Sequence, residues 1–226
     1  MYLPSHFEET RPEVLQQLLR SQPLGLLVTQ GRAGLEANAL PFLLDPERGP
    51  HGTLRAHVAR ANPVWHEARG DVDSMVVFQG PQAYVSPGWY ATKKVTGKVV
   101  PTWNYVMVTA RGRLQLRDDA DWVRRCVGEL TDRHEAPLGA PWKVDDAPAD
   151  YIATLLQAIV GIEIELTSLT GKWKVSQNRP VADREGVARG LAEVGGTEAV
   201  AMARQVLQPG SAMKEKEAAK PPPRSV

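Results

Sequence analysis

Basic residues are concentrated in two stretches of the chain that contain no carboxylate. Asp73 and Asp118 bracket 44 residues without Asp or Glu, and the second stretch runs over 167–182. The cations in the two stretches are Lys93, Lys94, Lys98, Arg111, Arg113 and Arg117 in the first, and Lys172, Lys174 and Arg179 in the second. Since carboxylates would lower the positive potential, their absence favours a site for a phosphate, on a nucleotide cofactor or on DNA. The depletion of acidic residues from β-strands explains the same pattern without a ligand.

Aromatic and polar side chains crowd the first of these stretches. Seven of them fall within 22 residues, namely Tyr84, Ser86, Trp89, Tyr90, Trp103, Asn104 and Tyr105. Aromatic faces that also carry a polar group suit a planar heterocycle such as the isoalloxazine ring of a flavin. The alternative is that these residues fill the core or a contact between subunits.

Composition and motifs exclude several other classes of protein. Lys and Arg total 27 and Asp and Glu total 26, so a net charge of +1 excludes a binder of polyanions that works through bulk charge. We find no glycine-rich phosphate loop of either common type and no classical helix-turn-helix motif. The histidines lack the spacing and the Cys partners of a zinc site, so no metal is expected. Cys126, the single cysteine, excludes a disulfide framework and falls on the apolar stripe of a predicted helix.

The elements predicted around these residues are mostly short strands. Thr10 and Glu13 have the spacing of a capping box, with Pro12 in the first turn, and predict a helix over 11–20. Strands are predicted at 24–28, 35–44, 54–58, 74–79, 82–86, 99–117 and 162–167. Because single helices rather than βαβ units interrupt them, we predict a mainly β fold with flanking helices (α+β), built as an antiparallel barrel with helices packed outside.

The remaining helices are predicted from caps and apolar stripes. Asn62 before Pro63 is expected to cap a short helix that ends at Gly70, and Asp118 or Asp119 to cap the helix that contains Cys126. Further helices are predicted at 149–159, 180–193 and 197–207.

Residues 1–208 are predicted to form a single domain. The tail 209–226 has little apolar surface to bury and is expected to be disordered. We predict neither a signal peptide nor a membrane helix, and the single cysteine fits a reducing cytoplasm. A soluble cytoplasmic protein is therefore expected.

Five short segments occur together along the chain. They are MYLPSHF at 1–7, HVARANP at 57–63, FQGPQAYVSP at 78–87, VPTWNY at 100–105 and GKWKVSQNR at 171–179. In this order they resemble the PaiB family of FMN-binding negative transcriptional regulators, and the resemblance extends from residue 1 to about residue 207. It implies an FMN-binding split barrel, related to the folds of pyridoxamine-phosphate oxidase and flavin reductases. It also implies a homodimer with the flavin at its interface.

The resemblance also implies a set of cofactor-binding residues. Arg60 and Asn62 stand where a strand meets a helix N-terminus, a natural seat for the FMN phosphate, with His57 beside them. A surface ion pair is the alternative for Arg60, and a structural role is the alternative for His57. The other residues expected around the flavin are Ser86, Trp89, Tyr90, Thr102, Trp103, Asn104, Lys174, Ser176, Gln177 and Asn178. Barrel closure and dimer packing are the alternative for those between 86 and 104.

One position departs from the family pattern. Thr109 stands where the family commonly carries His, and a threonine hydroxyl cannot titrate near neutral pH, so no imidazole function is expected there.

The function expected from the resemblance is that of an FMN-binding negative transcriptional regulator. The alternative is a flavin-dependent oxidoreductase that acts on an unknown small molecule, in which the flavin supplies the chemistry; no catalytic residue is assigned. Direct contact with DNA receives less support, because residues 1–208 contain 23 basic and 24 acidic side chains.

Overall fold

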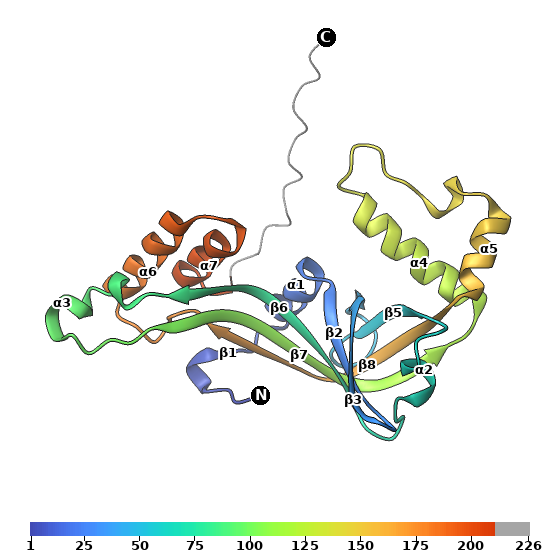
Figure 1. Cartoon of the computed structure of the whole chain (residues 1–226), viewed down its shortest axis with the longest axis horizontal. Coiled ribbons are helices and arrows are strands. Elements are labelled where there is room, and N and C mark those ends of the chain that lie inside the picture. The colour runs from blue at the N-terminus through green and yellow to red at the C-terminus, as the bar shows by residue number, and fades with distance from the viewer. Residues whose placement is uncertain (211–226) are drawn as a thin grey trace, which may run out of the picture.

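An antiparallel sheet of eight strands forms the centre of the molecule (Figure 1). The computed structural model describes residues 1–210, so almost all of the predicted tail lies outside the described residues. The strands are β1 (Glu8–Glu9), β2 (Leu24–Gly31), β3 (Gly34–Pro41), β4 (Leu43–Asp45), β5 (Thr53–Ala59), β6 (Ser74–Val85), β7 (Thr102–Arg117) and β8 (Ile159–Lys174). They are hydrogen-bonded in the order β3-β2-β6-β7-β8-β5-β4, with β1 paired to β8, so the sheet does not close into a ring over the described residues.

Seven α-helices flank the sheet in the described part of the chain. They are α1 (Pro12–Ser21), α2 (Val64–Glu67), α3 (Thr92–Thr96), α4 (Ala120–Glu135), α5 (Ala149–Gln157), α6 (Val181–Val194) and α7 (Thr197–Leu207). Among residues 1–210, none of these helices combines the length and apolar character that crossing a membrane requires.

The predicted strands are all present, and several differ in extent: β8, predicted at 162–167, runs from Ile159 to Lys174. The segments at 74–79 and 82–86 form one strand, β6, whose pairing with β7 shifts register between Gln79 and Gln82. Pro81 lies in this bulge, where a residue without an N–H group loses no ladder hydrogen bond. The segment predicted at 35–44 is divided into β3 and β4, and β7 begins at Thr102 rather than at residue 99.

Helix caps confirm one prediction and contradict another. The capping box of Thr10 and Glu13 is wrong, because α1 starts after Arg11 and has no side-chain cap. Glu9 accepts the Arg11 backbone N–H instead, at 3.0 Å. Asp119 caps α4 as predicted, and its carboxylate accepts the backbone N–H of Trp122 at 2.7 Å.

The core lies between the sheet and the helices packed on it. Leu27, Phe78, Val106 and Ile162 come from four different strands, and each is 0% exposed. Trp173 on β8 donates its indole N–H to the Gln205 side chain on α7 at 3.1 Å, so the last helix is joined to the sheet by a buried hydrogen bond.

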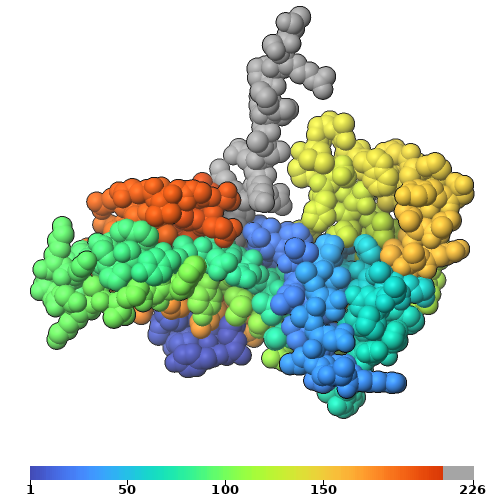
Figure 2. All heavy atoms as spheres, viewed as in Figure 1, coloured from blue at the N-terminus to red at the C-terminus, as the bar shows by residue number. Residues whose placement is uncertain are grey.

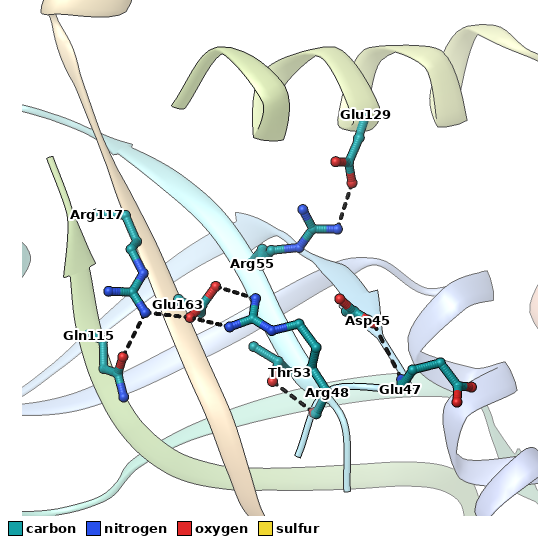
Figure 3. Close-up of polar contacts among 9 residues, drawn as sticks. All are labelled: Asp45, Glu47, Arg48, Thr53, Arg55, Gln115, Arg117, Glu129 and Glu163. Atoms are coloured by element: carbon teal, nitrogen blue, oxygen red, sulfur yellow. Dashed lines mark hydrogen bonds and ion pairs between the residues drawn. The ribbon is translucent and has the colours of Figure 1, made fainter. Parts of the chain in front are cut away.

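Glu163 departs from the alternation expected along β8. A charged residue of a half-buried strand usually faces solvent, but the Glu163 side chain is only 3% exposed. Arg48 donates to both of its carboxylate oxygens, at 2.7 and 2.9 Å, and Arg117 donates to one of them at 2.7 Å (Figure 3). The carboxylate can be buried because the two arginines supply the hydrogen bonds that water would otherwise supply.

The long strands β6, β7 and β8 run between the two ends of the molecule (Figure 1). One end carries α3 at the tip of the β6–β7 arm, together with α6 and α7; the other carries β5, α4 and α5. The tip of the arm protrudes beyond the helices next to it in the space-filling view (Figure 2). The predicted site residues fall at both ends.

Candidate functional site

The two acid-free stretches of sequence are neighbours in the sheet. β7 and β8 pair so that Tyr105 lies opposite Lys174 and Met107 opposite Lys172. Both lysine ammonium groups lie against the Tyr105 ring, at 5.3 Å for Lys172 and 5.9 Å for Lys174 from its centroid. Pairing of the strands therefore places lysines of the second stretch against aromatic and polar residues of the first.

A small pocket of about 120 Å³ lies at this end of the sheet, and we name it the polar pocket. It brings together six of the predicted cofactor residues, namely Tyr90, Thr102, Asn104, Lys174, Ser176 and Asn178. Arg179 also lines it and was not among the predicted site residues, although it belongs to the second acid-free stretch. No Asp or Glu is among the described residues that line this pocket.

Lys174 is the half-buried cation of the polar pocket. Its ammonium donates to the Thr102 hydroxyl and to the Trp103 carbonyl, both of which are uncharged oxygens. Burial lowers the pKa of Lys174, and the nearby charges of Lys172 and Arg179 lower it further. An anion bound beside this group would relieve that repulsion and raise the pKa again.

Tyr90 places a buried hydroxyl at the same pocket. The residue is 2% exposed, and its hydroxyl has no hydrogen-bond partner of good geometry among the described residues. The Arg179 guanidinium lies 4.8 Å from the centroid of its ring. Burial raises the pKa of Tyr90, so the hydroxyl stays protonated and is available as a donor to a ligand oxygen.

The turn after β8 is fixed by its own side chains. Ser176 has a φ of 65°, a left-handed conformation that costs free energy in a residue other than glycine. Asn104 donates to the Ser176 hydroxyl at 2.9 Å, and both residues are buried. Gln177 accepts the Val175 backbone N–H at 2.8 Å and so stabilises the turn. Strain held in place by buried hydrogen bonds is typical of binding sites.

A second, more open pocket lies beside the turn between α6 and α7, and we name it the aromatic pocket. Its volume is about 600 Å³, and Ser86, Trp89 and Trp103 from the predicted set line it. Tyr84 meets Trp103 edge to face, with ring centroids 6.2 Å apart. The Ser86 hydroxyl accepts the Gly88 backbone N–H at 3.1 Å, and this hydrogen bond stabilises the turn that contains Trp89.

Arg60 and Asn62 lie at the opposite end of the molecule. The Arg60 guanidinium forms an ion pair with Asp118 at 2.5 Å and donates to the carbonyls of Gln157 and Ile159 at 2.9 and 3.2 Å. This is the surface ion pair considered above as the alternative to phosphate binding. Asn62 donates to the Asn38 side chain at 2.7 Å and accepts the Val64 backbone N–H at 3.0 Å, which supports the start of α2.

His57 lies on β5 opposite Gly161 of β8 and is half-buried. Its Nδ1 has no hydrogen-bond partner in the described part of the chain. Burial lowers the pKa of His57, so the imidazole is neutral at pH 7 and cannot supply positive charge to a phosphate.

The two groups of predicted residues are too far apart to contact one cofactor within one chain. Ile159, at the start of β8, pairs with Ala59 beside Arg60, whereas Lys174 ends the same strand. At a rise of about 3.3 Å per residue, the strand path between them is roughly 50 Å. A mononucleotide that contacts both groups must therefore bind between two chains.

The polar pocket fits the phosphate group of FMN. It supplies two cations and the buried Tyr90 hydroxyl, which has no hydrogen-bond partner of good geometry among the described residues, in a space of about 120 Å³, whereas the charge of Arg60 is already matched by Asp118. FMN supplies hydride and electron transfer when it is bound. The residues of this chain contribute the positive charge and the donors that would hold the cofactor there.

Comparison with known proteins identifies relatives over nearly the whole chain. The model of a family described as "Putative FMN-binding domain" matches residues 1–168. An uncharacterized protein, AN0679, of Emericella nidulans is 34% identical, over 96% of this chain and 100% of that protein. The protease synthase and sporulation protein PAI 2 of Bacillus subtilis is 28% identical, over 84% of this chain and 89% of that protein.

A solved structure shares the fold. The flavocytochrome Anf3 from Azotobacter vinelandii superposes with a TM-score of 0.53 at 14% identity, over 74% of this chain and 69% of that chain. The comparisons confirm the resemblance to the PaiB family, the antiparallel split-barrel fold and FMN as the cofactor. The family model ends before Lys174, so the assignment of particular cofactor-binding residues stays a prediction.

Proposed function

The chain belongs to the family of FMN-binding domains, and on this premise we propose that it acts in the cytoplasm as an FMN-binding homodimer that represses transcription. The observation that carries the FMN part of the proposal is the polar pocket, where Lys174 and Arg179 of the second acid-free stretch meet polar residues of the first, with no carboxylate in the described lining. The regulatory part is supported by the name of the 28% identical relative, which refers to protease synthesis and sporulation.

The FMN phosphate is proposed to bind between Lys174 and Arg179. Among the described residues, neither cation has a carboxylate partner, so both charges are available to a ligand. Tyr90 donates its hydroxyl to the same phosphate in this arrangement. Charge-assisted hydrogen bonds of this kind contribute roughly 1.5–3 kcal/mol each.

A second copy of the chain is proposed to complete the cofactor site. Because the strand path separates the polar pocket from His57, Arg60 and Asn62, these residues contact the same FMN only if they come from the partner chain. The partner then contributes to the flavin ring or the ribityl chain, while the phosphate is held by the polar pocket.

Titration with FMN tests the cofactor site. Quenching of flavin fluorescence should be saturable, and Lys174→Ala or Arg179→Ala should weaken FMN binding about 10–100-fold, as expected for one lost charge-assisted contact. Riboflavin, which lacks the phosphate, serves as the control ligand and should bind the wild-type protein and both variants equally.

Arg60→Ala is the comparison variant: because Asp118 already balances this guanidinium and the partner's Arg60 is proposed to lie at the ring or ribityl chain, the substitution should change FMN and riboflavin binding equally. The phosphate would belong at Arg60 rather than at the polar pocket if this variant lost FMN-specific affinity while Lys174→Ala kept it. No saturable binding by the wild-type protein would remove FMN from the proposal.

Transcript profiling tests the regulatory role. A strain that lacks the gene should show increased transcripts that return to normal when the wild-type gene is restored. The Lys174→Ala gene should restore repression only weakly if repression depends on FMN. An unchanged transcript profile after deletion would contradict the regulatory proposal.

A further inference from the structure

Three lysines gather at the tip of the β6–β7 arm. We define the basic tip as Lys93 and Lys94 on α3 together with Lys98 just after it; all three are exposed. Figure 1 shows α3 at the extreme end of the arm, and in Figure 2 the same segment protrudes from the body. These lysines line neither the polar pocket nor the aromatic pocket.

The charges of the basic tip are free of acidic partners in the described part of the chain. No ion pair involves any of the three lysines there, and the whole of 74–117 lacks a carboxylate. Asp183 on α6 is a carboxylate that accepts hydrogen bonds at the base of the tip. It is 1% exposed and accepts the backbone N–H and the hydroxyl of Thr92, both at 2.9 Å.

Asp183 therefore anchors the base of the tip and leaves the lysines beyond it exposed. Gly97 ends α3 with a φ of 66°, a left-handed conformation that glycine adopts without strain, and so turns the chain back toward β7. The basic residues are held on a short, fixed projection rather than spread over a face.

We propose that the basic tip contacts the phosphate backbone of duplex DNA. The proposal rests on the regulatory function proposed above and assigns to it the surface that contacts DNA. Residues 1–208 have 23 basic and 24 acidic side chains, so attraction to DNA must come from a local concentration of charge rather than from the whole body. A homodimer would present two such tips.

The composition of the tip favours DNA over a small free anion. Val95, at 84% exposure, lies between the lysines, and proteins that enter the minor groove commonly combine basic residues with an exposed apolar side chain. The three lysines are exposed and line neither the polar pocket nor the aromatic pocket, so neither pocket supplies enclosed donors that would hold a small anion beside them.

Binding to a labelled DNA duplex at several salt concentrations tests the proposal. The triple variant Lys93→Gln, Lys94→Gln, Lys98→Gln should bind at least about tenfold more weakly at low salt. Since each phosphate contact contributes about 0.9 to the slope of log K against log salt, the slope should fall by up to about 3 for each bound chain.

The matched control changes the same net charge elsewhere. Arg32, Arg125 and Arg189 are exposed, and the triple variant Arg32→Gln, Arg125→Gln, Arg189→Gln should keep both the affinity and the slope of the wild-type protein. FMN affinity is measured on every variant and should be unchanged, so that a failure of the cofactor proposal is separate from a failure of this one.

Three outcomes would overturn the inference. One is that the full-length wild-type protein, loaded with FMN, does not bind DNA even at low salt. Another is an equal loss of DNA binding in the control variant, which would indicate unspecific attraction. The third is a tip variant that loses FMN affinity or dimerisation while keeping DNA affinity, which would assign the tip to the partner chain or to its cofactor.

Discussion

At the scale of single residues, Glu163 shows how an acidic side chain becomes part of the sheet interior. Burial raises the pKa of its carboxyl group, but hydrogen bonds and charge from Arg48 and Arg117 outweigh this effect and hold the pKa below its ordinary value. A carboxylate whose pKa is lowered by folding stabilises the protein above the pKa of an unfolded glutamate. That contribution is lost as the pH falls through the lowered folded value.

Glu163→Gln should therefore lower the free energy of unfolding at pH 7 by about 1–3 kcal/mol, because two arginines lose a charged acceptor at a buried position. Urea denaturation at several pH values measures the effect, and the difference from the wild-type protein should shrink in acid. Glu165→Gln, at an exposed position on the same strand, is the control and should change stability little. Equal effects of the two substitutions would show that the buried network of Glu163 and its arginines adds nothing to the free energy of unfolding.

At the scale of elements, α6 packs closely against the turn that contains Trp89 because α6 has glycine at the points of contact. A Cβ atom on Gly190 would lie 2.4 Å from the Trp89 ring, and one on Gly186 would lie 2.0 Å from the Trp89 carbonyl oxygen. The missing side chains let α6 approach the end of β6 closely enough to form one wall of the aromatic pocket. The position of Trp89 is thus set by a helix about 100 residues further along the chain.

Gly190→Ala should displace Trp89 and destabilise the protein by about 1–3 kcal/mol through overpacking. Thermal unfolding followed by tryptophan fluorescence reports both effects. Gly128→Ala on α4 is the matched control, since nothing lies within 4 Å of its added Cβ, and better helix propensity should make that variant equally or slightly more stable. Equal stability of both variants would mean that the contact between α6 and Trp89 tolerates a methyl group.

At the scale of the whole molecule, β2 exposes apolar side chains that water does not favour. Leu24 is 65% exposed and Leu26 is 43% exposed. On the neighbouring strand β3 they lie opposite Pro41 and Ala39 respectively. Val77 of β6 pairs with Leu26 on the other side. These residues define an apolar β2 face, which we propose as the interface of the homodimer proposed above.

Leu26→Lys should weaken the homodimer at least about 30-fold, as expected when a charge replaces a central apolar contact worth about 2 kcal/mol. Sedimentation analysis over a range of concentrations measures it. Leu35→Lys, at a 75% exposed position at the hairpin end of β3, is the control and should leave the dimer intact. A wild-type protein that stays monomeric at all concentrations would exclude the dimer, and a dimer insensitive to Leu26→Lys would move its interface elsewhere.

Local sequence signals predicted the candidate site in part. The segment 171–179 and the two acid-free stretches identified Lys174, Ser176 and Asn178, which line the polar pocket together. Arg179 was not predicted as a site residue, although it belongs both to the segment 171–179 and to the second acid-free stretch. Arg60 could not be judged from sequence, because its partner Asp118 is 58 residues away and only the fold brings the two together.

The sequence by itself determined the strands, most helix boundaries, the family and the cofactor, because periodicity, caps and short motifs are properties of neighbouring residues. The tertiary structure alone decided which charges are free and which are neutralised. It places Lys174 and Arg179 in a pocket whose described lining contains no acid, and it brings Asp118 to Arg60 and two arginines to Glu163. The physical reason is that electrostatic energy depends on distance and burial in space, and separation along the chain does not fix either.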